Sequence, residues 1–281
     1  MNSKLFLALL IALAYPTLSY CQHSDANDSI TVERLLADGD GTTLCYARQL
    51  LGRPYVAHTL EVNSREQLVV NLRGLDCTTL VETVSALALC ARKGEKDYRS
   101  FCRHLQQLRY RQGRLDGYAS RLHYFSDWID DNATMGLVSE IKTEQAPFSA
   151  VQTLNINYMS QHPQAYKALR QNPSLVEKIK KQEQRLTGRK YRYIPKQEVT
   201  DTETLRRLIH DGDIIAITCS KPGLDIAHLG FAVWQKDGLH LLNASQIHKK
   251  VVEEPMTLGE YLKKHPSHTG IRVVRLAKKG E

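Results

Sequence analysis

The hydrophobic pattern of this 281-residue chain changes its period about two thirds of the way along. In "TTLVETVSALALCAR", residues 78–92, apolar residues recur every three or four positions, which is typical of a helix with a buried face. Three later stretches favour strands instead: residues 213–220, 226–245 and 270–276. The Asp-Gly pair at 237–238 predicts a hairpin turn inside the second of them. Helices followed by a run of antiparallel strands predict an α+β domain.

Capping residues and helix breakers mark where the expected helices begin and end. Asp28 or Ser29 is suited to cap the first helix and Gly39 to end it, while Asn172 and Pro173 suit the start of a later one. The expected elements are helices over 28–38, 43–51, 78–92, 96–110, 161–170, 172–187 and 201–211, a short strand over 66–76, and a loop over 111–132.

The N-terminal segment "MNSKLFLALLIALAYPTLSYCQ" has one Lys, an apolar run over residues 5–14, then Pro16 and small residues. This layout is typical of a secretory signal peptide, which we expect over residues 1–21. "LSYC" at 18–21 resembles a lipoprotein box, so cleavage after Cys21 and lipidation of Cys21 both stay open. No second run of spanning length follows, so we expect an exported, periplasmic protein whose mature chain has no transmembrane span.

Composition narrows the partners that the mature chain could bind. The net charge of +8 is spread along the sequence without a dense basic tract, which argues against nucleic acid and suits anionic polymers such as cell-wall material. Five cysteines follow Cys21, and no CxxC pair is present, which argues against a cysteine-rich zinc site. Whether Cys90 and Cys102 pair is left open by their spacing.

Cys77 stands directly behind Asp76 at the expected start of a helix. Asp76 can cap that helix, which leaves the thiol in the first turn, where free N–H groups and the helix dipole favour an anion. Such a position lowers the pKa of a thiol and makes it a nucleophile. The alternative is a buried, inert cysteine, the interpretation that suits Cys90 at the other end of the helix.

A thiol nucleophile needs a base, and "AHLGFAVW" supplies one. His228 shares a strand face with Gly230, which leaves room for a substrate, and points away from the apolar side. The next strand offers Asn243 to orient His228. A two-residue turn at Asp237 and Gly238 would pair Asn243 with Ala232, too far from His228, so we expect a longer loop or a bulge. Ser245 or His248 could orient His228 instead.

Together these residues resemble the NlpC-type cell-wall cysteine hydrolases of the papain-like fold. Their pattern has "DC" opening a helix, a "HVGIY"-like strand and a "HAS"-like strand, matched here by "DC" at 76–77, "HLGFAV" at 228–233 and "NAS" at 243–245. Asn243 stands where His is more usual, and papain-like enzymes use Asn in that role. The implied architecture is a nucleophile helix packed on an antiparallel sheet, plus helical insertions.

One branch of that group is more similar still. The motifs "YVAHTLE", "NLRGLDCTTLVETVSALAL", "RYRQG", "SRLHYFSDWIDDN", "HDGDIIAIT", "GLDIAHLGFAV" and "TGIRVVRL" resemble a group associated with N-acetylmuramoyl-L-alanine amidase activity, over residues 43–276. The resemblance implies a single domain over 28–281 with a helical or loop insertion at about 95–200. His58 stands where the group commonly has Gly.

The implied reaction is hydrolysis of the amide between N-acetylmuramic acid and L-alanine. Cys77 would attack the carbonyl, His228 would protonate the leaving nitrogen, and water would resolve the thioester. The Cys77 N–H and Tyr55 are the candidate oxyanion donors. Neither a metal nor an organic cofactor is expected, and the implied partners are muropeptides or peptidoglycan fragments, bound by a monomer.

The expected loop over 111–132 is crowded with polar and aromatic side chains. Arg121, His123, Tyr124 and Trp128 could form a wall that binds the sugar and its lactyl group. The alternative is that the aromatic residues pack into the core and the polar residues face water. Further candidate substrate contacts are Asp76, Ser245 and Asp225, and the last could equally be a turn residue.

The same residues leave other functions open beside the amidase. A γ-D-glutamyl stem-peptide endopeptidase would use the same catalytic residues, a muropeptide-binding module would need none of them, and an acyltransferase would pass the acyl group to another acceptor. The large insertion favours small fragments over intact wall. The remaining histidines lack the spacing of metal ligands and are expected at the surface or in packing contacts: His104, His162, His210, His240, His265 and His268.

Overall fold

The computed structural model describes residues 26–277, so the predicted signal peptide and Cys21 lie outside the described residues. The helices are α1 Ala26–Asp38, α2 Thr43–Gln49, α3 Cys77–Lys93, α4 Tyr98–Arg109, α5 Phe125–Thr134, α6 Tyr158–Gln161, α7 Lys167–Gln171, α8 Pro173–Leu186, α9 Glu203–Leu208 and α10 Leu258–Lys264, with 3-10 turns η1 Arg111–Gly113, η2 Tyr118–Ser120 and η3 Pro163–Ala165. The strands are β1 Val138–Ile141, β2 Ala150–Thr153, β3 Lys190–Pro195, β4 Ile214–Cys219, β5 Ile226–Gln235, β6 Gly238–Ser245, β7 Lys250–Glu253 and β8 His268–Leu276.

One antiparallel sheet organises these elements. Its strands run in the order β2-β3-β8-β4-β5-β6-β7, and β1 pairs separately with β8. The C-terminal strand β8 therefore enters the sheet beside β4, while β4 to β7 follow one another as neighbours. This arrangement confirms the predicted α+β class and its antiparallel sheet.

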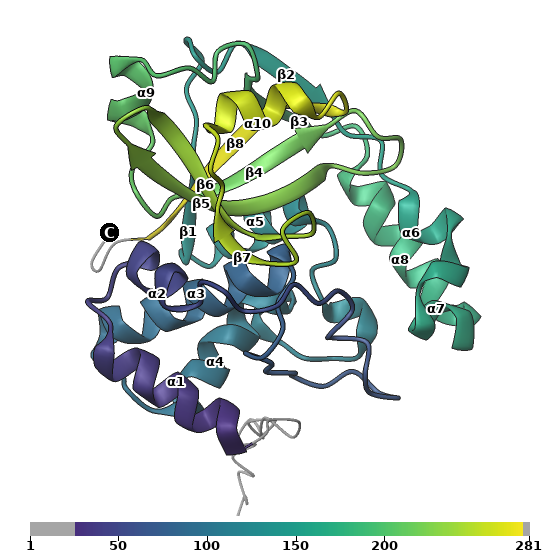
Figure 1. Ribbon diagram of the computed structural model, residues 1–281. Helices are drawn as coiled ribbons and strands as arrows, with labels where there is room; N and C mark the ends of the chain where they lie inside the picture. The colour runs from purple at the N-terminus through teal and green to yellow at the C-terminus, as the bar shows by residue number, and fades with distance from the viewer. Residues whose placement is uncertain (1–25, 278–281) are drawn as a thin grey trace, which may run out of the picture.

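Helices cover both faces of the sheet (Figure 1). Helices α1 to α5 form a layer on one face, where alternate sheet residues such as Leu229 and Phe231 join a large apolar core with α3. Helices α9 and α10 cover the other face, where Ala232 and Ile217 meet Leu262 of α10. Helices α6 to α8 project to one side around a smaller apolar cluster. The predicted alternation of faces along β5 is therefore confirmed.

The structure corrects four details of the expected elements. Residues 66–76 form no strand ladder; they run as an irregular segment with isolated bridges, among them the one from Leu75 to Tyr55. The second half of the expected loop is helix α5. Asp28 lies inside the first turn of α1 rather than at its cap, and its carboxylate accepts a hydrogen bond from the Leu72 N–H.

The fourth correction concerns the expected insertion at about 95–200. This segment also contributes strands β1, β2 and β3, which pair into the sheet, so it is more than helix and loop. Asn172 does cap α8 as predicted, because its side chain accepts from the Ser174 N–H. Within residues 26–277 no helix is long and apolar enough to cross a bilayer.

Candidate active site

Cys77 is the first residue of α3, and its position is fixed by a capping box. The Asp76 carboxylate accepts from the Thr79 N–H at 2.8 Å, and the Thr79 hydroxyl accepts from the Asp76 N–H at 2.9 Å. These two bonds satisfy backbone donors that a helix start leaves without partners. The prediction that Asp76 caps this helix is confirmed, and the half-buried Cys77 sits at the positive end of a 17-residue helix.

The electrostatics of Cys77 differ from the expectation. Burial raises the pKa of the thiol to about 12, and the Asp76 carboxylate adds to this rise, although hydrogen bonds from the Leu229 N–H and from Thr78 oppose it. The resting thiol is therefore protonated at neutral pH, and the expected low pKa is wrong because loss of hydration outweighs the helix terminus. A cysteine in this state needs a base to remove its proton.

His228 and Asn243 form the side-chain pair that the sequence predicted. The Nε2 of His228 lies 3.0 Å from the Oδ1 of Asn243. The expected longer loop is absent, because β5 and β6 pair Gln235 with Gly238. The two turn residues are therefore at positions 236 and 237, one position earlier than the expected Asp-Gly pair. The last pair of this register is Phe231 with Leu242, so the next pair along the strands would set Asn243 opposite Gly230.

Gly230 has a different use from the one expected. A Cβ at this position would lie 2.6 Å from the Leu242 carbonyl oxygen and 2.7 Å from Leu241 Cδ1. The missing side chain therefore lets β6 approach β5 closely, rather than leaving room for a substrate. A bulge does occur beside His228, but on the β4 side, where Ile217 pairs with His228 and Thr218 with Ile226.

His228 is suited to act as a base. Burial lowers the pKa of its imidazole, and the hydrogen bond to Asn243 only partly offsets this, so the ring is neutral at neutral pH. The Cys77 thiol accepts from the N–H of Leu229, the residue that follows His228, which brings Cys77 and His228 to the same end of β5. Among the described residues the two side chains share no direct hydrogen bond, a common situation before substrate binds.

Glu254 extends this chain of contacts, and sequence reasoning missed it. Its Oε1 accepts from Asn243 Nδ2 at 2.9 Å, and its Oε2 lies 3.1 Å from His248 Nε2. The residue is 2% exposed, whereas nothing in "VVEEP" distinguishes it from Glu253. His248 and Ser245 do not orient His228: His248 contacts Glu254, and the buried Ser245 hydroxyl accepts from the His248 N–H.

A family model and a solved structure point to the same family. The AmiA-like family, described as N-acetylmuramoyl-L-alanine amidase-like, matches residues 46–271. The chain is 43% identical to an N-acetylmuramoyl-L-alanine amidase from Bacteroides uniformis, over 85% of this chain and 100% of that one, with a TM-score of 0.79. This chain belongs to the AmiA-like family.

Two further solved structures are similar to this AmiA-like chain. A Bacteroides fragilis protein, whose description names a xylanase, is 42% identical over 82% of this chain and 99% of that one, with a TM-score of 0.76. A Legionella pneumophila protein shares the fold at 24% identity, over 89% of this chain and 95% of that one, with a TM-score of 0.67. No match was found among curated proteins.

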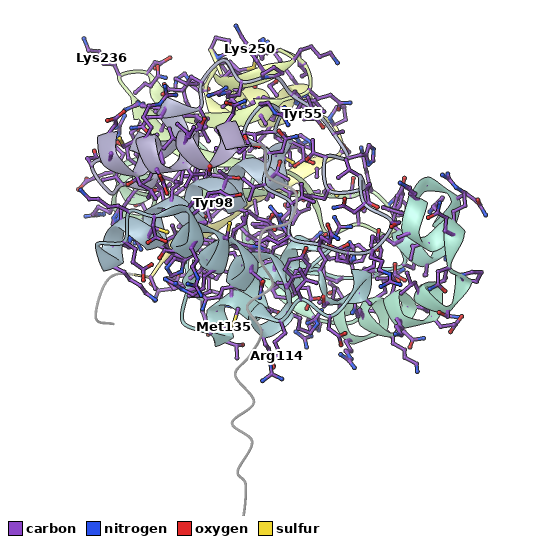
Figure 2. The ribbon with its side chains drawn as sticks, turned by 90° about the horizontal axis from the view of Figure 1, so that it is seen from below. Tyr55, Tyr98, Arg114, Met135, Lys236 and Lys250 are labelled. Atoms are coloured by element: carbon purple, nitrogen blue, oxygen red, sulfur yellow. The ribbon has the colours of Figure 1, made fainter. Side chains whose placement is uncertain are left out.

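Tyr55 lies close to Cys77 in this AmiA-like chain. Burial raises the pKa of its phenol, and the proximity of Cys77 and Asp76 raises it further, so the hydroxyl keeps its proton and can donate. The Tyr55 N–H donates to the Lys249 carbonyl at 2.9 Å, which ties this segment to the end of the sheet. Figure 2 shows Tyr55 in the neighbourhood of Lys250.

The expected sugar wall is wrong for its two aromatic members. Trp128 is 0% exposed and stacks on Phe125, with ring centroids 4.7 Å apart. Tyr124 is buried, and its hydroxyl donates to Glu183 at 2.7 Å. Both rings are core residues: α5 buries its apolar face in the large core beside α4 and β1, and Tyr124, just before α5, packs in the smaller cluster with α8.

The two polar members of the wall are also turned inward. Arg121 is 6% exposed and pairs with the carboxylates of Glu61 at 2.5 Å and Glu66 at 3.3 Å. His123 Nε2 lies 2.9 Å from the Tyr118 carbonyl, and burial lowers the pKa of His123 to about 3. The aromatic residues follow the alternative interpretation, but these polar residues face partners rather than water.

Asp225 has a structural contact that the sequence did not indicate. Its Oδ2 accepts from the Ser126 N–H at 2.6 Å, so a buried carboxylate from the segment before β5 caps the first turn of α5. The cap is supplied from 99 residues away, because Tyr124 at the N-cap position provides no side-chain cap. This contact links α5 to the strand that carries His228.

Two aromatic residues from other elements also lie near the site. Burial raises the pKa of Tyr261 on α10 to about 12, with smaller contributions from Glu254 and Cys77. Burial lowers the pKa of His268 on β8 to about 4, with contributions from His265 and His228. His265 stacks on His268 with centroids 4.7 Å apart, so these histidines are packing residues, as expected.

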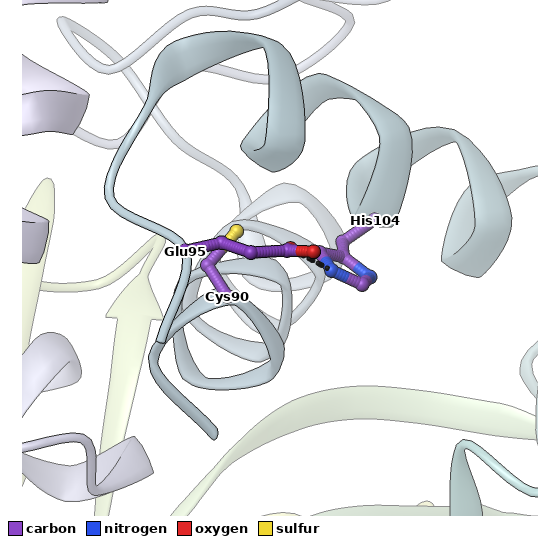
Figure 3. A group of neighbouring side chains, drawn as sticks. All are labelled: Cys90, Glu95 and His104. Carbon is purple, nitrogen blue, oxygen red and sulfur yellow. Dashed lines mark hydrogen bonds and ion pairs between the residues drawn. The ribbon is translucent and has the colours of Figure 1, made fainter. Parts of the chain in front are cut away.

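Potential metal ligands gather at the other end of α3. Cys90, Glu95 and His104 place their ligand atoms within 4.8 Å of one another (Figure 3). His104 already has partners for both ring nitrogens, Glu95 at 2.8 Å and Gln107 at 3.1 Å, and the second Glu95 oxygen pairs with Arg103 at 2.6 Å. The group is a satisfied hydrogen-bond network, and thirteen helical residues separate it from Cys77 by about 20 Å. Cys90 and Cys102 are both free thiols.

Proposed function

We propose that this AmiA-like chain is a cysteine amidase that cleaves the bond between N-acetylmuramic acid and L-alanine in peptidoglycan fragments. The observation that carries the proposal is the His228–Asn243 pair at 3.0 Å, whose strand donates the Leu229 N–H to the Cys77 thiol. A neutral base beside a protonated thiol is the arrangement from which attack on an amide can start.

The proposed reaction proceeds through a thioester. His228 takes the proton of the Cys77 thiol as the sulfur attacks the lactyl carbonyl carbon, and the negative charge moves to the carbonyl oxygen. The Cys77 N–H and the protonated Tyr55 hydroxyl are the proposed donors to that oxygen. As the carbon–nitrogen bond breaks, the imidazolium returns its proton to the alanine nitrogen, which leaves as a free amine.

Water completes the cycle. His228 removes a proton from a water molecule that attacks the thioester, the carbon–sulfur bond breaks, and the imidazolium protonates the departing Cys77 sulfur. The muramic acid product carries the new carboxyl group.

The wider context of the enzyme is also a proposal. The order of nucleophile helix, histidine strand and asparagine strand supports an NlpC-type, papain-like core in one domain over 28–281. The N-terminal sequence supports export to the periplasm, with Cys21 as a possible lipid anchor, and the fragment substrates suit a monomer that acts on released wall pieces.

Amine release from two substrates tests the proposal. The wild-type chain, Cys77→Ala and the control Cys45→Ala, which removes another half-buried thiol, are each incubated with N-acetylmuramoyl-L-alanine and with a sugar-free stem tetrapeptide. We expect release from the muramoyl substrate by the wild type and Cys45→Ala only. Release from the tetrapeptide alone would favour the γ-D-glutamyl endopeptidase, and release from neither substrate would contradict the hydrolase.

Purified wall sacculi address the substrate size. If the enzyme acts on released fragments, it degrades sacculi much more slowly than N-acetylmuramoyl-L-alanine. Equal rates on both would contradict the preference for fragments while leaving the amidase proposal intact.

A further inference from the structure

Glu254 is a buried carboxylate held rigidly one contact beyond Asn243. Its N–H donates to the Leu241 carbonyl at 2.9 Å, and its own carbonyl lies 2.9 Å from His240 Nδ1. Its two side-chain oxygens contact Asn243 Nδ2 and His248 Nε2. Both backbone and side chain are therefore anchored, and the carboxylate points at the amide that orients His228.

A carboxylate accepts hydrogen bonds and cannot donate them, so it selects one orientation of the Asn243 amide. The Nδ2 of Asn243 must face Glu254, which leaves Oδ1 facing His228. Since Oδ1 only accepts, His228 must carry its proton on Nε2. The lone pair of the neutral imidazole is then on Nδ1, the nitrogen that remains for the Cys77 proton.

The opposite amide orientation would disable the base. If Asn243 turned its Nδ2 toward His228, Nε2 would have to accept, and the ring proton would move to Nδ1. A ring protonated on Nδ1 cannot take a proton from the thiol through that nitrogen. The group on the other side of the Asn243 amide from His228 decides which of the two amide orientations is adopted. In this protein that group is Glu254.

We propose that Glu254 is a positioning residue that sets the tautomer of His228 through the amide of Asn243. The proposal rests on the proposed function for its catalytic consequence, but the tautomer itself can be observed without any substrate. His248 strengthens the arrangement by occupying the second carboxylate oxygen, so that Glu254 does not rotate away from Asn243.

Glu254→Gln is the variant that tests the role, since Gln has the same shape but can either donate or accept toward Asn243. Glu253→Gln is the matched control: the neighbouring carboxylate points elsewhere, to Arg48 at 2.7 Å. With N-acetylmuramoyl-L-alanine we expect Glu254→Gln to lower kcat by at least about tenfold with KM unchanged, because general base catalysis supplies roughly 10²–10⁴-fold. Glu253→Gln should match the wild type.

Nitrogen-15 NMR of the histidine rings reads the tautomer directly, with the His228 signals assigned by their absence in His228→Gln. We expect His228 protonated on Nε2 in the wild type and in Glu253→Gln, and a population protonated on Nδ1 in Glu254→Gln. A pure Nε2–H ring in Glu254→Gln would overturn the proposal, whatever its activity. If no variant hydrolyses the substrate, the proposed function fails while this readout still decides the tautomer.

A double-mutant cycle shows whether Glu254 acts through Asn243. In an Asn243→Ala background the amide is gone, so Glu254→Gln should lower kcat no further. Equal fold-losses in both backgrounds would mean that Glu254 acts by another route and would overturn the proposal. Thermal unfolding of all variants separates loss of the fold from loss of the base.

Discussion

Asn243 contacts His228 across a diagonal of the sheet rather than as its direct partner. The two residues are 15 positions apart, and the register sets Asn243 toward Gly230, yet Oδ1 and Nε2 are 3.0 Å apart. Diagonal neighbours on one face of an antiparallel pair lie within reach of polar side chains, and the missing side chain at Gly230 lets the strands come close. The His228 ring is thus oriented by a regular hairpin.

The pH dependence of catalysis should reflect the neutral state of His228. Burial holds the pKa of His228 below 6.5, so the ring stays unprotonated and usable as a base under mildly acidic conditions. We expect the acid limb of kcat/KM for N-acetylmuramoyl-L-alanine to fall below pH 6.5. An acid limb clearly above this value would mean that a nearby negative charge, rather than burial, dominates at His228.

Alkylation of Cys77 should be slow at neutral pH. Its pKa is raised to about 12, so little thiolate exists near pH 7, and the rate with iodoacetamide should keep rising through pH 9, the ordinary value. Peptide mapping by mass spectrometry separates Cys77 from the half-buried Cys45 in the same sample. A rate that levels off below pH 8 would show a stabilised thiolate and contradict the protonated resting state.

The sequence alone predicts the parts of this site that follow from the spacing of residues along a strand or from the cap of a helix. Two-residue alternation placed His228 on one face of β5, and the cap placed Cys77 at a helix start. It could not supply the hairpin register, because Gly238 begins β6 instead of occupying the turn, a choice made by the packing of both strands. Nor could it identify Glu254, whose role depends on a contact across β6 and β7.

Residue types alone also could not show whether the aromatic residues of the segment 111–132 bind substrate or pack in the core. Trp128 and Tyr124 stand in a segment rich in polar residues, so a loop beside the site was a reasonable expectation. The decisive factor is packing: helix α5 buries Trp128 in the large core beside α4, while Tyr124, just before α5, packs in the smaller apolar cluster around α8. Asp225 caps this helix from a segment 99 residues away, a contact that the local sequence around α5 cannot predict.

Substitutions at Trp128 should change stability and leave substrate binding alone. Trp128 is fully buried, so Trp128→Ala should lower the free energy of unfolding by roughly 3–5 kcal/mol. Trp128→Phe keeps most of the packing and removes an indole N–H that has no partner among the described residues, so its KM should equal that of the wild type. A raised KM in the stable Trp128→Phe variant would restore the sugar-wall interpretation.

Replacement of His58 by Gly should be tolerated or mildly stabilising. His58 has φ of 62°, in the left-handed region that costs a non-glycine residue about 1–2 kcal/mol. Glycine removes this cost, but its greater freedom in the unfolded chain lowers the free energy of unfolding by roughly 0.5–1 kcal/mol. Urea unfolding should therefore give a change near zero or slightly positive for His58→Gly and a clear loss for His58→Val. A marked loss for His58→Gly would point to a contact of the imidazole.

The helix that carries Cys77 also depends on a buried ion pair. Glu82 on α3 accepts from Arg109 Nε on α4 at 2.7 Å, both side chains are 2% exposed, and Arg109 also donates to the Val69 carbonyl. Removing one partner leaves a charge buried alone, so Glu82→Ala or Arg109→Met should each cost roughly 3–5 kcal/mol in urea unfolding. The double variant Glu82→Leu with Arg109→Met removes both charges and should recover much of that loss. Losses that simply add in the double variant would show that the segment at Val69, rather than the charge pair, holds α3 against α4.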